Sequence, residues 1–361
     1  MSLKELKAIP YQPVADSPAV RYYTDWNAFE PYLENPAPPV QLGWDDDALR
    51  LLNLKPDLIL KPTPLKDKPE LPEASSKRVL AFHLNTLNSQ VNVFLRDTSY
   101  TILVPKPREG VLATHLSVRA TGNSTLNVLL LSPTDAEGLN TLSIDVEVDT
   151  ASTLRLNYII RDSYRAPSPI FQRTRLDKDS RLETFLIGSR GRMTHMEMNQ
   201  LLEGEASEAE TVALLAAGKF SRITLETSAE TRAPRTEISI RGLGFANEGF
   251  IAHKGFARAR RGAMESRLEV RSRLIPLSPT SRVYAAPVLE IESDEPSYAA
   301  HSVAMGPLDP EHIFYIESRG FNEAEAVRLL VKSMYASLIS RLRGSSLYQH
   351  ALRLLLEELG L

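Results

Sequence analysis

The chain has 361 residues, of which 43% are hydrophobic and 24% charged, and its formal net charge at pH 7 is −3. This composition is ordinary for a globular protein that buries a core of its own. The absence of cysteine excludes disulfides, thiolate metal ligands and a cysteine nucleophile on this chain. The slightly acidic balance argues against nucleic acid as a partner. No apolar run approaches membrane-spanning length, and the first residues lack the layout of a signal peptide. We therefore expect a cytoplasmic protein with no membrane partner.

Residues 1–77 differ from the rest of the chain because they are rich in proline and acidic residues. Short helices are expected at Asp25–Tyr32 and Asp46–Leu54. Five prolines between residues 56 and 72 then prevent long regular elements. We expect a small helical and proline-rich N-terminal region.

From about Arg78 to residue 295 the chain alternates apolar and polar residues in short segments, which predicts half-buried strands. The segment Met264–Leu274 is the clearest case, since serine and apolar residues alternate with charged ones throughout. Glycines between these segments predict turns. Such a series is compatible with a sandwich, a barrel or a β-solenoid, and we see no strict repeat that would choose among them.

Residues 296–361 have helical periodicity. Asn322 and Glu325 form a predicted capping box, and apolar side chains from Val327 onward recur at helical spacing. Gly344 is expected to end this helix and Ser346 to begin another. The apolar stripes require a surface to cover, which is either the strand body or a partner protein.

The sequence contains no familiar catalytic motif, so we do not expect an enzyme. His195 and Glu197 lie two apart on a predicted strand and share a face. They could form a general-base pair or two metal ligands, or simply an outward polar ladder. The basic run from Arg258 to Arg273 is interrupted by glutamates, which favours a solvated face or the rim of a protein interface over nucleic-acid binding.

A second polar cluster is predicted at the end of the strand region. Glu290, Glu292 and Asp294 share one face, and His301 follows in the segment after the last predicted strand. Carboxylates with a nearby imidazole can hold iron or another borderline metal. The alternative is a cluster at the end of a strand, exposed to water.

The stretch from about Gly255 to Phe321 resembles the C-terminal core of the SufB/SufD family of iron–sulfur cluster assembly proteins. The resemblance rests on a P-x-L-E-I strand, a histidine before small residues and a glycine, and a final F-Y…S-R-G segment. These motifs correspond here to Pro287, Leu289, Glu290, Ile291, His301, Gly306, Phe314, Tyr315, Ser318, Arg319 and Gly320. The chain is most similar to the SufD side of the family and to its compact archaeal type.

The resemblance implies a right-handed parallel β-helix body over residues 78–295, a helical N-terminal region over 1–77 and a helical C-terminal region over 296–361. It also implies pairing through the β-helix with a SufB-like subunit or a second copy. A SufC-type ABC ATPase would dock on the C-terminal region, for which Phe314, Tyr315, Arg319 and Met334 are the expected contact residues. His301 falls on the histidine that SufD supplies near the nascent cluster, whereas Ser302 stands where SufB has a glutamate.

The expected function is that of a non-catalytic scaffold subunit for iron–sulfur cluster assembly. Without cysteine the isolated chain should hold no cofactor tightly, while a cluster would be present transiently in the complex and a reduced flavin could bind. Two other functions remain open at this stage. The chain could be a homodimeric adaptor for the ATPase without cluster chemistry, or a β-helix enzyme acting on polysaccharide.

Overall fold

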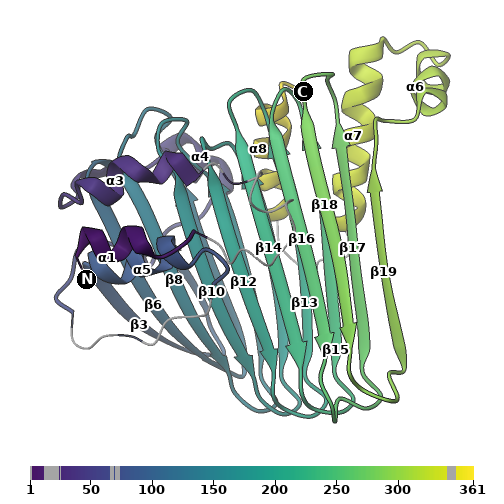
Figure 1. Cartoon of the computed structure of the whole chain (residues 1–361). Helices are drawn as coiled ribbons and strands as arrows, with labels where there is room; N and C mark the ends of the chain where they lie inside the picture. The colour runs from purple at the N-terminus through teal and green to yellow at the C-terminus, as the bar shows by residue number, and fades with distance from the viewer. Residues whose placement is uncertain (1, 12–23, 25, 66–68, 70–73, 340–346) are drawn as a thin grey trace.

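The computed structural model describes residues 2–11, 24, 26–65, 69, 74–339 and 347–361. Within these residues the fold is mainly β and is a parallel β-solenoid with helices at both ends (Figure 1). Each coil of the solenoid contributes one strand to each of two facing sheets, whose strand neighbours are parallel. The structure therefore confirms the mainly β, solenoid architecture that the resemblance implied.

The two sheets divide the strands by order along the chain. The first sheet is called the even sheet below, because its strands from β6 onward have even numbers. It contains β3 (Ser89–Arg96), β6 (Val111–Thr121), β8 (Leu139–Val148), β10 (Ser168–Leu176), β12 (Thr194–Leu202), β14 (Arg222–Thr231), β16 (Phe250–Ala259) and β18 (Arg282–Ile291). The second, called the odd sheet, contains β2 (Leu58–Ile59), β4 (Ser99–Leu103), β7 (Asn123–Leu131), β9 (Thr153–Arg161), β11 (Arg181–Ser189), β13 (Glu208–Ala217), β15 (Glu237–Ala246), β17 (Arg267–Pro276) and β19 (Tyr298–Met305). A separate antiparallel pair joins β1 (Val40–Gly43) to β5 (Lys106–Glu109).

Alternation of side chains builds the solenoid core, because successive residues of a strand point to opposite faces. In β17, Leu268, Val270 and Leu274 are fully buried inside the coil, and Arg271 lies outside on the same strand. The inward residues of all coils form one continuous apolar cluster. Met264, which the pattern assigned to this strand, lies in the preceding turn and is half exposed.

The same turn connects an even strand to the next odd strand in the five coils from β8 to β17. One residue of the turn adopts a left-handed conformation with φ between 54° and 58°, as at Ala151, Asp179, Ala206, Arg235 and Glu265. The next residue is always a buried serine or threonine, namely Ser152, Ser180, Ser207, Thr236 and Ser266. In several coils this hydroxyl donates to the carbonyl three residues earlier, as Ser207 does to Gly204 at 2.7 Å. The hydroxyl adds a hydrogen bond within the turn, to a carbonyl that in the turns of Ser180 and Ser207 also accepts the backbone N–H of the same residue.

Helices cover the outer faces of both sheets, except for α6, which projects from the body. The helices are α1 (Leu3–Ala8), the 3-10 helix η1 (Trp26–Phe29), α3 (Glu30–Glu34), α4 (Asp46–Leu52), α5 (Lys77–Thr86), α6 (Pro310–Glu317), α7 (Glu323–Ile339) and α8 (Leu347–Leu359). Apolar residues of α1, η1, α3 and α5 pack on the even sheet. Those of α4, α7 and α8 pack on the odd sheet, so most of the C-terminal apolar stripe covers the strand body.

The predicted helix boundaries can be compared with those observed. The Asn322 side chain accepts from the backbone N–H of Glu325, and the Glu325 carboxylate accepts from that of Asn322, each at 2.9 Å, which confirms the capping box. The expected boundaries at Gly344 and Ser346 lie outside the described residues. β19 pairs with β17, so the strand body extends beyond residue 295, where the sequence placed the start of the helical region.

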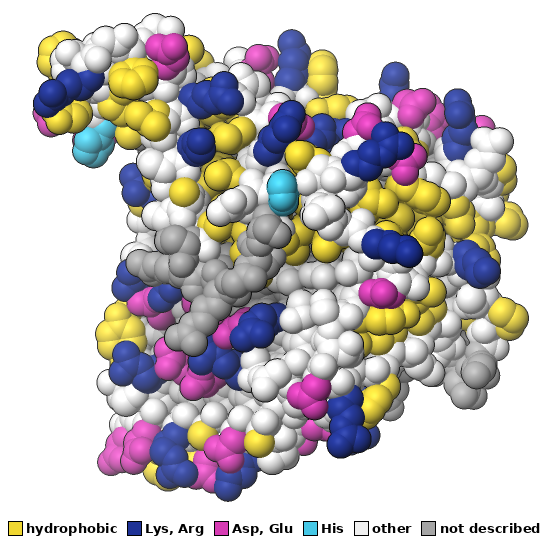
Figure 2. Space-filling model, turned by 180° about the vertical axis from the view of Figure 1, so that it is seen from behind, with side chains coloured by type: hydrophobic (Ala, Val, Ile, Leu, Met, Phe, Trp, Pro, Cys, Tyr) yellow, Lys and Arg dark blue, Asp and Glu magenta, His cyan; other side chains and the backbone are white. Residues whose placement is uncertain are grey.

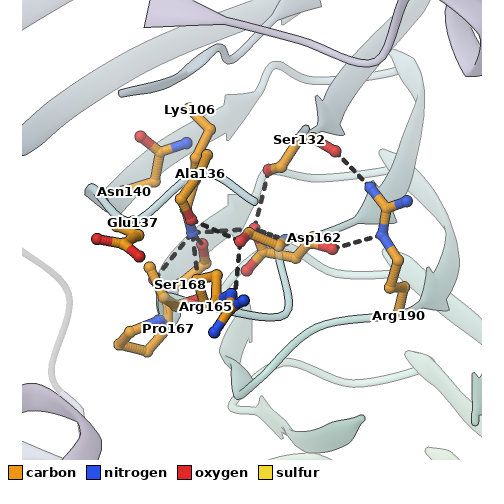
Figure 3. A network of polar contacts seen from close by, with 12 residues as sticks. Lys106, Ser132, Ala136, Glu137, Asn140, Asp162, Arg165, Pro167, Ser168 and Arg190 are labelled. Carbon is orange, nitrogen blue, oxygen red and sulfur yellow. Dashed lines mark hydrogen bonds and ion pairs between the residues drawn. The ribbon is translucent and has the colours of Figure 1, made fainter. Parts of the chain in front are cut away.

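A buried polar network joins the turns that follow the odd strands, on the side of the solenoid near α4 and α8 (Figure 3). Lys106 is fully buried, and its ammonium group donates to Asp162 at 2.9 Å, to Ser168 at 2.7 Å and to the carbonyl of Pro167 at 3.0 Å. The guanidinium of Arg190 donates to the carbonyl groups of Ser132 and Asp162. A buried ion pair of this kind contributes little net stability, but removing one partner leaves an uncompensated charge. The network therefore fixes the relative positions of successive turns.

In the part of the chain that the structure describes, no helix combines the length and apolar character required to cross a membrane.

The core position of Leu268 leads to a stability prediction. Leu268→Asp buries an unpaired carboxylate inside the coil and should lower the free energy of unfolding by at least about 4 kcal/mol, measured by urea denaturation. Arg271→Ala on the same strand removes an exposed side chain and should change it by less than about 1 kcal/mol. Equal effects of the two substitutions would contradict the assignment of inner and outer faces.

Candidate functional site

The C-terminal end of the solenoid is open. β18 and β19 are the last strands of their sheets and pair only with β16 and β17 within the described chain. Their outer edges therefore present unpaired backbone groups, which can pair with a strand of another chain. Several apolar side chains at this end are 39–49% exposed: Ile291, Tyr298, Val303 and Met305. Among the residues that the structure describes, no further coil pairs with these strands.

His301 lies within β19, the last strand, and not after it as the sequence pattern suggested. It is in register with Val270, whose side chain is fully buried in the solenoid core. Neighbours in register on parallel strands point to the same side, so the imidazole faces the interior side of the coil. It is nevertheless exposed, because no further coil covers this strand. The solenoid thus presents one histidine at its open end.

The acidic candidates occupy a different surface. Glu290 is in register with Arg258 on the outer face of the even sheet, and the two side chains form an ion pair of 3.1 Å. Glu292 pairs with Arg258 and also with Arg260, the latter at 3.2 Å. The hydrogen bond from Arg258 lowers the pKa of Glu292. Both carboxylates are therefore already neutralised by guanidinium groups.

The structure does not bring these four residues together into one metal site. Asp294 lies exposed in the turn between β18 and β19, while His301 faces inward and Glu290 outward. Among the described residues, no group of three or more histidine, aspartate or glutamate side chains is placed to hold a metal ion. The basic run is likewise interleaved with carboxylates, as in the Arg271–Glu269 pair of 2.6 Å. A metal at the open end would therefore need further ligands from another chain.

The residues expected to contact the ATPase fall into two groups. Phe314 and Tyr315 of α6 are 71% and 59% exposed, and Arg319 stacks on the Tyr315 ring at 5.2 Å. α6 projects from the body, has no buried residue and carries exposed apolar side chains (Figures 1 and 2). Met334 of α7 is instead half-buried and packs against the apolar cluster on the odd sheet. The accessible part of the predicted surface is therefore α6.

His195 and Glu197 lie on the outer face of the even sheet, but the N-terminal segment buries both. His195 contacts Glu197 at 2.9 Å through Nε2 and the Thr224 hydroxyl at 2.7 Å through Nδ1. The Glu197 carboxylate accepts from the backbone N–H groups of Ser75 and Ser76, just before α5. These contacts attach the start of α5 to the sheet.

Glu226 completes this buried group and carries no signal in the sequence. It accepts from the Ser75 hydroxyl at 3.2 Å and lies 4.0 Å from the ammonium of Lys254. Burial, and next the charge of Glu197, raises the pKa of Glu226. For Glu197 burial acts in the same direction, but the hydrogen bonds from His195 and Ser76 outweigh it and lower the pKa. The group attaches the N-terminal segment to the even sheet, because Ser75 and Ser76 bind to its two carboxylates.

The fold and the open end define a class: a parallel β-solenoid in which, among the described residues, the last strand of each sheet has a free edge. Residues 103–334, more than half of the chain, match the SufBD core domain of the SUF system for FeS cluster assembly. The chain belongs to the SufBD family. This membership supports a role in iron–sulfur cluster assembly.

Individual relatives agree with this assignment. An iron–sulfur cluster assembly SufBD family protein of Mycobacterium tuberculosis is 27% identical over 283 residues, which cover 73% of this chain and 70% of the relative. The assembly protein SufD of Bacillus subtilis is 28% identical over 171 residues, or 43% and 38% of the two chains. A SufBD family protein of Mycobacterium leprae is 44% identical over 61 residues, covering 17% of this chain and only 16% of the relative.

The raised pKa of Glu226 generates a pH-dependent prediction. When the pKa of a carboxyl group is higher in the folded than in the unfolded state, the free energy of unfolding falls as pH rises between the two values. Above the folded-state pKa the folded protein contains a buried charge. Glu226→Gln removes this penalty. Its gain in the free energy of unfolding over the wild type should be absent below the ordinary value of 4.5, and should grow as pH rises through the folded pKa to about 1 kcal/mol or more.

Urea denaturation at several pH values between 4 and 8 measures this difference. Glu203→Gln, which neutralises an exposed carboxylate, is the matched control and should show no comparable growth with pH. A Glu226→Gln variant less stable than the wild type at pH 7 would contradict the prediction.

Proposed function

We propose that this chain is a SufD-like, non-catalytic subunit of a cytoplasmic iron–sulfur cluster assembly scaffold. The observation that carries the proposal is the open end, where His301 lies exposed on the inward side of the last described strand. The correspondence of His301 with the SufD histidine, and of Ser302 with the SufB glutamate position, supports the SufD-like assignment. The absence of cysteine is consistent with a partner that supplies the thiolates.

The proposed pairing uses the edges of β18 and β19. A second solenoid with equivalent open edges could extend both sheets by strand addition, and the exposed Val303 and Met305 would become buried. The partner is a SufB-like subunit or a second copy of this chain. In such a complex the imidazole of His301 would lie in the interface, where a neutral ring nitrogen can bind iron.

The proposed ATPase contact is α6. Its exposed aromatic pair borders a surface depression of about 590 Å³ that includes Pro310, Glu311 and Ser318. Aromatic side chains at the centre of an interface commonly contribute most of its binding energy. A SufC-type ABC ATPase is the partner that the family context implies for this projecting helix.

The first test concerns His301. Changing His301 to Ala should leave the melting temperature and ATPase binding intact, because the ring is exposed and makes no core contact. Cluster maturation in a strain that depends on the Suf system should fall on the order of tenfold or more, as is typical for groups near a metal centre. Ser302→Ala, which alters the outward neighbour on the same strand, is the matched control. Full maturation in the His301 variant would refute the site, and loss of the complex itself would assign the residue to pairing.

The second test concerns α6. Phe314→Asp should weaken binding of the ATPase by about 2 kcal/mol or more, roughly thirtyfold, in a pull-down or calorimetric titration. Phe94→Asp makes the same change at a comparably exposed phenylalanine (64%) at the other end of the solenoid and should leave binding unchanged. If both variants bind like the wild type, the ATPase docks elsewhere.

The third test concerns the cluster. The purified chain alone should contain no stoichiometric iron or sulfide and show no visible absorption from a cluster, because thiolates are the usual ligands and the chain has none. We propose that a cluster is present only transiently, in the complex. Iron and sulfide analysis that found a stable cluster on the isolated chain would overturn this part of the proposal.

A further inference from the structure

A cavity of about 630 Å³ lies away from the open end, where turns of the solenoid meet the N-terminal segment. Its walls include Arg165 from the β9–β10 turn, Arg192 from the β11–β12 turn and Phe220 from the β13–β14 turn. A second depression of about 450 Å³ shares Arg165 and Arg192, so the two spaces adjoin. This size is in the range of small-molecule sites.

The larger cavity has an excess of positive charge. Arg165, Arg192 and Arg222 line it, against the single carboxylate of Asp135, while Glu109 and Glu137 line the adjoining depression. Within the described residues, neither Arg165 nor Arg192 forms an ion pair, whereas nearby Arg161 pairs with Glu357 at 3.0 Å. The guanidinium of Arg222 is already placed 4.5 Å from the centre of the Phe250 ring. Two guanidinium groups without a partner on one cavity favour an anion.

The cavity also has aromatic walls. The Phe220 ring is 73% exposed, and the ammonium group of Lys219 lies 5.5 Å from its centre. The Tyr164 ring is half-buried, and its hydroxyl is held by Glu358 of α8 at 3.0 Å. Such rings provide flat apolar contact area for a ligand.

The buried network of Figure 3 holds these walls in place. Ser163, next to Asp162, donates its hydroxyl to the carbonyls of Thr134 and Ala136 and accepts from the backbone N–H of Arg165 at 3.0 Å. Its own carbonyl accepts from the backbone N–H of Arg192 at 2.8 Å. One buried serine thus connects three turns of the cavity. Buried hydrogen bonds between turns specify local geometry, which is what a preorganised binding site requires.

We propose that this cavity binds a small organic anion, in which one oxyanion group such as phosphate or carboxylate is joined to a flat apolar ring. The oxyanion binds to Arg165 and Arg192, and the ring packs between Tyr164 and Phe220. This site is separate from the open end and from α6, and it does not depend on the function proposed for them. The competing interpretation is that the two arginines are merely solvated side chains of exposed turns.

Isothermal titration calorimetry of the full chain with phenyl phosphate separates the two interpretations. Saturable binding is expected, tighter than for inorganic phosphate. Arg165→Gln and Arg192→Gln should each weaken it about tenfold, the effect of one charge-assisted hydrogen bond. Arg273→Gln, which removes an exposed arginine from the outer face of β17, is the matched control and should bind like the wild type.

Phe220→Ala tests the aromatic wall and should weaken phenyl phosphate binding without changing that of inorganic phosphate. All four substituted side chains are exposed, so the variants should melt at the wild-type temperature without ligand. No saturable binding, or an equal loss in the Arg273 variant, would overturn the site. Phenyl phosphate that binds no tighter than inorganic phosphate would overturn the role of the ring-bearing group.

Discussion

Stacking of parallel strands in strict register is the constraint on which this molecule depends. The equivalent positions Thr153, Arg181, Glu208, Glu237 and Arg267 follow one another at intervals of 28, 27, 29 and 30 residues. A coil of nearly constant length keeps every inward side chain above another inward side chain. A shift by one residue would move apolar groups to the outside and charged ones into the core. The left-handed turn residue and the buried hydroxyl after it hold that length from coil to coil.

The same stacking explains why the two ends of the solenoid differ from its middle. Each coil satisfies its backbone groups only by pairing with the coils before and after it, so the last coil leaves its outer groups unpaired. The C-terminal helices do not solve this problem, because α7 and α8 pack on the outer face of the odd sheet and α6 projects away. The open end therefore follows directly from where the helices pack, and it combines unpaired edges, exposed apolar groups and one imidazole.

How far the sequence predicts this fold depends on the feature concerned. Alternation identified some of the strands and their inner faces, as at Leu268 and Val270, because the period of two is a local property. Alternation could not select a coil over a sandwich, because both bury one face of every strand, and only the family resemblance made that choice. A signal was nevertheless present: the buried serine or threonine after each turn recurs at the coil length, as at Ser180 and Ser207.

The candidate site was harder to predict than the fold. Glu290 and His301 are close in sequence, but they lie on different sheets. Glu290 faces outward from the even sheet, whereas His301 faces the inside of the coil from the odd sheet. Sequence proximity cannot show this, because the small residues around His301 give no alternation from which its direction could be inferred. For a related reason, the sequence did not predict the contacts of Glu197 with Ser75 and Ser76, or the network around Lys106. Their partners are 56 to 122 residues away, and no local pattern reports such contacts.

Charged and polar groups are arranged differently in the buried turns around Lys106 and at the open end of the solenoid. Where Lys106, Asp162 and Arg190 are buried, every ammonium or guanidinium group has close acceptors, so the surrounding turns have one arrangement. At the open end the Glu290–Arg258 pair is on the outer face, and the inward positions described for β19 carry His301 among apolar and small residues. Desolvating a neutral imidazole costs far less than desolvating a carboxylate or an ammonium group. A second chain can therefore cover this end without burying an unpaired charge. In the pairing proposed above, the His301 ring would be the polar side chain of β19 that becomes covered.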